Sequence, residues 1–126
     1  MENSTMQRGP EQWFLDAHPE RGSVRVQVST GRGLFPVEGA RVEIYRRLGP
    51  EPTVFYEGVT DASGIAEDIH LPALPAGWSQ SAETAGISGT VYQVSVRHPQ
   101  HGTVEGRPVT VFPRIETVLA VSLGAA

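Results

Sequence analysis

The chain has 126 residues, a length that suits one domain built around a single hydrophobic core. It contains no cysteine, which excludes disulfide bonds, thiolate metal ligands and cysteine catalysis. Its formal net charge of -4 argues against a nucleic-acid-binding protein, because such proteins need a basic face.

The sequence predicts neither a membrane span nor a Sec signal peptide, and export by another route stays open. No run approaches the roughly 20 consecutive apolar residues of a spanning helix, so no membrane span is predicted. The first residues lack the basic and apolar regions of a Sec signal peptide. We therefore expect a protein that is cytoplasmic as synthesised.

Residues 1–21 are mostly polar and contain one apolar cluster, formed by Trp13, Phe14 and Leu15. Chain termini are often mobile unless their side chains are held by the body of the domain. We expect a partly ordered arm that docks these side chains on the body or carries a short helical turn.

From residue 23 onward, apolar and polar residues alternate with a period of two, which is typical of half-buried strands. Strands are expected at 23–29, 40–45, 53–59, 65–71, 92–97, 103–112 and 115–123. This count of about seven strands, with frequent turn signals and no convincing helix, favours a sandwich or a barrel. The domain should span residues 22–123, followed by a short tail at 124–126.

Two details of these strands bear on the side-chain directions. Ile65, Ile69 and Leu71 are expected to share the inner face of their strand. The register of 53–59 stays open, with either Val54 and Tyr56 or Phe55 and Val59 as the paired set. Between the fourth and fifth strands, Asp61-Ala62-Ser63-Gly64 is a strong tight-turn signal.

Several segments resemble elements of the carboxypeptidase-regulatory-like and transthyretin-like (prealbumin-like) domains. They are Gly22–Val28, Pro36–Val42 ("P-V-x-G-A-x-V"), Thr60–Gly64 ("T-D-x-x-G"), Tyr92–Pro99 and Val118–Leu123. The resemblance covers residues 22–123 and implies an all-β, seven-stranded antiparallel Greek-key β-sandwich. One departure is that Gln100-His101-Gly102 stands where the family usually has Gly-Tyr.

The resemblance also implies a setting. Variants with a long proline-bearing loop occur in spore-forming bacteria, in some cases beside peptidoglycan-binding or cortex-processing modules. It therefore implies a small accessory or structural role near the envelope or the spore, although a fold alone does not fix a function.

The potential catalytic and metal-binding residues do not form a recognisable site in the sequence. His98 and His101 lie three apart in one turn, but a tight metal site needs more ligands than two. Asp61 and Asp68 could suggest calcium, yet turn geometry accounts for Asp61. The hydrolases among the transthyretin-like proteins end in the motif Tyr-Arg-Gly-Ser, which this chain lacks. We expect no catalytic residue, no metal and no cofactor, with a small metal-dependent hydrolase as the remote alternative.

Aromatic and arginine residues are enriched where proteins bind partners. Three regions offer them: the long aperiodic loop at 72–90, the arm, and an outward-facing set on the 40–45 strand and its end. The candidate binding residues are Trp78, Trp13, Tyr45, Arg46 and Arg47. We expect the partner to be another protein or, alternatively, a cell-wall carbohydrate such as peptidoglycan, with homo-oligomers through edge strands also open.

Overall fold

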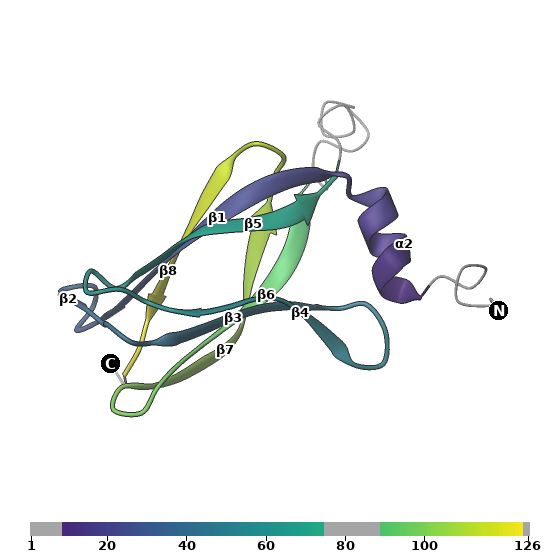
Figure 1. Cartoon of the computed structure of the whole chain (residues 1–126). Helices are drawn as coiled ribbons and strands as arrows, with labels where there is room; N and C mark the ends of the chain where they lie inside the picture. Colours follow the sequence, from purple (N-terminus) through teal and green to yellow (C-terminus); the bar gives the residue numbers. More distant parts are fainter. Residues whose placement is uncertain (1–8, 75–88, 125–126) are drawn as a thin grey trace.

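The computed structural model describes residues 9–74 and 89–124, and these form one β-sandwich with a short helix at one end (Figure 1). The helix is α2 (Pro10–Ala17). The strands are β1 (Glu20–Thr30), β2 (Phe35–Pro36), β3 (Arg41–Arg47), β4 (Pro52–Val59), β5 (Ile65–Ala73), β6 (Thr90–His98), β7 (Gly102–Val111) and β8 (Glu116–Ser122). Within the described ranges, no helix has the length and apolar character needed to cross a membrane.

The strands divide into two four-stranded sheets. In the first sheet β1 is central, with β5 and the short β2 along one edge and β8 along the other. The second sheet has the order β4-β3-β6-β7. The all-β Greek-key sandwich is confirmed, with two departures from the seven-stranded antiparallel prediction: the two-residue β2 brings the strands to eight, and β8 pairs with β1 in parallel.

The core lies between the two sheets, as the period-two alternation predicts. The inward valines of β1, β3 and β6 are each at most 2% exposed: Val24, Val26, Val28, Val42, Val94 and Val96. Burying such side chains stabilises a fold by roughly 1.5–3 kcal/mol each. The alternation therefore identifies the core face of these three strands.

The arm carries a helix of eight residues where the sequence suggested, as one alternative, only a short helical turn. α2 begins at Pro10, a residue type that suits the first helical turn, and ends at Ala17, with His18 as its C-cap just before Pro19. Eight residues form too short a helix to be stable alone, so its stability must come from contacts with the sandwich.

β-Bulges account for the errors in the predicted side-chain directions of β5 and β4. In β5, Asp68 adopts a left-handed backbone (φ 62°) where the register with β1 shifts, so Ile65 lies on the outer face while Ile69 and Leu71 point inward. In β4, Tyr56 pairs with Ile44 and Val54 with Tyr45. Neither proposed register is therefore regular, because the intervening Phe55 is an extra residue.

The long loop begins later than expected. β5 continues through Pro72 to Ala73, and both residues are buried and paired with the start of β1. Residues 75–88 lie outside the described part of the chain, so the candidate Trp78 lies outside it as well.

Candidate functional site

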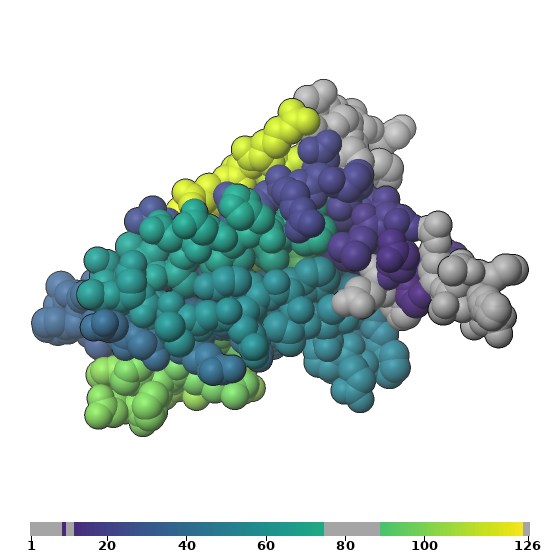
Figure 2. Space-filling view, viewed as in Figure 1, coloured from purple at the N-terminus to yellow at the C-terminus, as the bar shows by residue number. Residues whose placement is uncertain are grey.

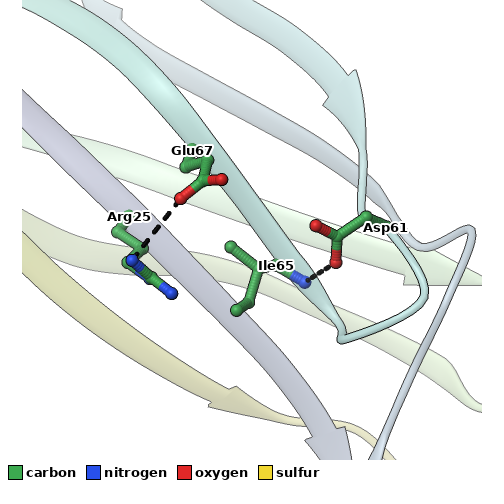
Figure 3. A network of polar contacts seen from close by, with 4 residues as sticks. All are labelled: Arg25, Asp61, Ile65 and Glu67. Carbon is green, nitrogen blue, oxygen red and sulfur yellow. Dashed lines mark hydrogen bonds and ion pairs between the residues drawn. The ribbon is translucent and has the colours of Figure 1, made fainter.

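The turn between β4 and β5 is built by Asp61. Its Oδ1 accepts hydrogen bonds from the backbone N–H of Ser63 (2.9 Å) and of Ile65 (3.0 Å), the second of which is drawn in Figure 3. This is the arrangement expected when an aspartate caps its own turn. The carboxylate is thereby engaged by the backbone, which supports the turn interpretation of Asp61 over a calcium site.

Thr60 ties this turn to the segment that precedes β3. Its buried Oγ1 accepts a hydrogen bond from the Ala40 amide (2.9 Å) and donates one to the Val37 carbonyl (2.6 Å). The Val37 amide in turn donates to the Val28 carbonyl in β1 (3.0 Å). The two family-like motifs, "T-D-x-x-G" and "P-V-x-G-A-x-V", therefore form one hydrogen-bonded platform at this end of the sandwich.

A groove of about 420 Å³ lies beside this platform, on the outer face of the first sheet. Its lining comes from β1, the β1–β2 turn, β2, the β4–β5 turn, β5 and β8: Gln27, Val28, Ser29, Gly33, Pro36, Ser63, Ile65 and Ala120. None of these side chains is ionisable. The groove offers one amide, two hydroxyls and an otherwise apolar surface.

The groove is bordered by exposed apolar side chains and one ion pair. Leu34 and Phe35, between the lining residues Gly33 and Pro36, are 74% and 59% exposed. Arg25 lies two residues from Gln27 on the same face of β1 and pairs with Glu67 of β5 at 3.4 Å (Figure 3). An exposed pair of this kind contributes little stability, so we regard it as a polar border of the groove.

The opposite end of the molecule is closed by α2 (Figures 1 and 2). Phe14 is 7% exposed and contacts Phe55 and Tyr92 edge-on, with ring centroids 5.6 and 6.2 Å away. The Arg46 guanidinium lies over the same Phe14 ring, 5.1 Å from its centroid, in a cation–π geometry. Phe14 is thus the residue that anchors the helix.

Two titratable groups at this end are affected by burial. Burial lowers the pKa of His18, whose ring stacks on Phe14 at 3.9 Å and whose Nδ1 lies 2.7 Å from the Phe14 carbonyl oxygen. Burial raises the pKa of Tyr92, whose hydroxyl donates to the Pro72 carbonyl (2.6 Å). Both groups have structural partners, so the perturbed pKa values do not by themselves indicate catalysis.

Of the binding residues proposed from the sequence, those that the structure describes lie on α2 and at the end of β3. Trp13 is 67% exposed on α2. The Tyr45 hydroxyl accepts a hydrogen bond from Ser95 (3.4 Å), and the Arg47 guanidinium donates to the Pro50 carbonyl (2.7 Å). Arg46 does not belong to an outward set, because it is half-buried over Phe14 and donates to the Val91 carbonyl.

His98 and His101 lie together in the β6–β7 turn, with ring centroids 4.8 Å apart. The Nδ1 of His98 accepts a hydrogen bond from the Gln100 amide (3.1 Å), so local turn structure already uses it. Over residues 9–74 and 89–124, no group of three or more potential metal-ligating side chains occurs.

The sequence did not indicate the groove. Ile65 was assigned to the core because the bulge at Asp68, which reverses its direction, leaves no periodicity signal. Ala120 and Ser29 are small residues on outward positions and carry no chemical motif. The useful signal was the "T-D-x-x-G" turn, which places Ser63 beside β1.

Comparison with known proteins supports the fold. None of the protein-family models and none of the curated proteins searched matches this chain. The 5-hydroxyisourate hydrolase of Klebsiella pneumoniae aligns over 82% of this chain and 92% of its own, with 12% identity and a TM-score of 0.51. This chain has a transthyretin-like fold.

Two further solved structures align less closely with this transthyretin-like sandwich. Transthyretin from Sparus aurata covers 81% of this chain and 90% of its own, with 15% identity and a TM-score of 0.49. (S)-Allantoin synthase covers 82% of this chain and 41% of its own, with 16% identity and a TM-score of 0.49. At such identities function has to be argued from the site.

Proposed function

We propose that this protein is a non-catalytic binding module that receives another protein in the groove on the outer face of its first sheet. The observation that carries the proposal is the lining of that groove, which is neutral throughout and bordered by the exposed side chains of Leu34 and Phe35. A concave surface with an apolar lining and a few hydrogen-bonding groups suits recognition.

The same lining argues against chemistry at this place. General acid–base catalysis needs an ionisable side chain within hydrogen-bonding distance of the reacting group, and nucleophilic catalysis by serine needs an adjacent base. No ionisable side chain lines the groove beside Ser29 and Ser63, and the Asp61 carboxylate next to Ser63 accepts hydrogen bonds from the backbone amides of Ser63 and Ile65. The fold accommodates both enzymes and other proteins, so this local chemistry supports the choice of a binding module.

The biological setting rests on the resemblance alone. We propose that the module is accessory to a larger envelope- or spore-associated assembly, in which it contributes a contact surface.

The test is to fill the groove without altering its platform. Ser63→Trp places a bulky ring in the groove, whereas Ala62→Trp changes the neighbouring exposed turn residue, which does not line it. Proteins captured from the native cell are quantified for the parent and both variants. We expect the parent and Ala62→Trp to retain the same partner and Ser63→Trp to lose it by about tenfold or more, as for a contact worth over 1.4 kcal/mol.

Equal capture by all three proteins would contradict the proposed groove. Retention on purified sacculi, abolished only by Ser63→Trp, would favour the carbohydrate-binding alternative. Turnover of 5-hydroxyisourate by the purified parent protein, lost in Ser63→Trp, would overturn the non-catalytic proposal.

A further inference from the structure

α2 is held on the sandwich through one aromatic ring that carries two basic groups. The His18 ring stacks on Phe14 with centroids 3.9 Å apart and planes 21° from parallel, and the Arg46 guanidinium lies 5.1 Å from the same Phe14 centroid. Arg46 is always charged, whereas the charge of histidine changes in the physiological pH range. A change in the charge of His18 therefore acts directly on the contact that anchors the helix.

α2 has little stability of its own to resist such a change. It has only eight residues, and Gly9 at its N-cap offers no side-chain hydrogen bond. The helix keeps its place through the edge-on contacts of Phe14 with Phe55 and Tyr92. A small loss of docking energy at Phe14 should therefore appear as a measurable increase in local opening of α2.

The neutral form of His18 already has the hydrogen bond that this position offers. Its Nδ1 lies 2.7 Å from the Phe14 carbonyl oxygen. Because a carbonyl oxygen only accepts, Nδ1 carries the hydrogen, and Nε2 carries none in the neutral ring. Protonation adds a second N–H and a positive charge, yet within the described residues no group accepts a hydrogen bond from Nε2.

The carboxylates nearest to His18 along the described chain are engaged elsewhere. Asp16 of α2 accepts a hydrogen bond from the Gln12 amide (3.0 Å). Glu20, at the start of β1, pairs with Arg114 (3.6 Å). Neither forms an ion pair with His18, so a protonated ring has no carboxylate partner among the described residues.

The strands packed against this end present no negative charge either. β3 presents the Arg46 guanidinium, β4 presents the uncharged ring of Phe55, and β6 presents Tyr92, with Arg21 of β1 near its hydroxyl. Burial raises the pKa of Tyr92, so its hydroxyl stays neutral. A protonated His18 would therefore be a further cation beside Arg46.

We propose that His18 is an acid-sensitive release for α2: protonation of its ring weakens the docking of the helix and uncovers Phe55 and Tyr92 at this end of the sandwich. Burial lowers the pKa of His18 from its ordinary value of 6.5, the hydrogen bond to the Phe14 carbonyl opposes this shift, and the Arg46 charge adds to it. The docked state thus favours the neutral ring. Docking is strongest above pH 6.5 and weakens as the pH falls through the lower pKa of the docked state.

Hydrogen exchange of the full chain at several pH values tests the proposal. Protection factors are compared, because they remove the intrinsic pH dependence of amide exchange. We expect the amides of residues 13–17 to lose protection by about threefold or more between about pH 7.5 and about pH 5, while β1 and β6 keep theirs. His18→Gln should abolish this response. His70→Gln, at an exposed histidine of β5, is the matched control and should preserve it.

NMR titration of the His18 ring in the parent protein supplies a readout that needs no variant. The ring should titrate below 6.5. A titration at or above that value, constant protection of α2 at both pH values, or the same loss of protection in His18→Gln would each overturn the proposal. The groove partner plays no part in these measurements, so their outcome is independent of the proposed function.

Discussion

At the scale of single residues, the family-like motifs mark where segments meet closely. Gly64 is the clearest case. Its backbone is left-handed (φ 76°), and a Cβ built on it would lie 2.4 Å from the Val28 carbonyl oxygen and 3.0 Å from the Val37 amide. β1, the segment before β3 and the β4–β5 turn can therefore approach one another only if residue 64 has no side chain. The sequence indicated the turn, but the triple contact depends on chain segments far apart in sequence.

Gly64→Ala should therefore destabilise the protein by more than about 2 kcal/mol, because backbone strain and a clash with main-chain atoms add together. Gly33→Ala is the matched control. Its glycine is also left-handed (φ 90°), yet a Cβ there would meet nothing within 4 Å, so about 1 kcal/mol of strain alone is expected. Urea unfolding of the two variants measures the difference. Equal losses of stability would show that the close approach at Gly64 is relaxed at little cost.

At the scale of elements, the sequence located the strands well and the helix poorly. Period-two patterns identified β1, β3 and β6 because one face of each contacts the core over its whole length. The arm carries Trp13, Phe14 and Leu15 in a row, and local sequence does not say which of the three is buried. The body of the sandwich decides this, because Phe55, Tyr92 and Arg46 all contact the Phe14 ring.

Phe14→Ala should release α2 from the sandwich. The helix is anchored mainly through this ring, and removing a buried phenylalanine costs about 3 kcal/mol, more than eight residues of helix can retain alone. We expect the amides of residues 13–17 to lose protection from hydrogen exchange while the strands keep theirs. Trp13→Ala, at a residue that is 67% exposed, should leave that protection nearly unchanged. Loss of α2 protection in Trp13→Ala instead would assign the anchor to the wrong aromatic residue.

At the scale of the whole molecule, the resemblance predicted the transthyretin-like sandwich correctly, because order and spacing of the motifs reflect strand topology. The sequence predicted the candidate site less well than the fold. The proposed aromatic and arginine residues of the described region lie on α2 and β3, whereas the groove lies at the far end and is formed by small, neutral residues. Such residues carry no recognisable chemistry until bulges and turns gather them, as the Asp68 bulge does for Ile65.

The central claim is that the partner binds in the groove on the outer face of the first sheet. Hydrogen exchange of this protein, free and saturated with the partner recovered by capture, tests that claim most directly. We predict that protection increases in segments 27–36 and 61–65, which carry most of the lining, and that it stays constant in segments 10–17 and 45–47. Protection gained only at α2 or at the end of β3, with the groove segments unchanged, would contradict the claim and assign binding to the surface around Trp13, Tyr45 and Arg47.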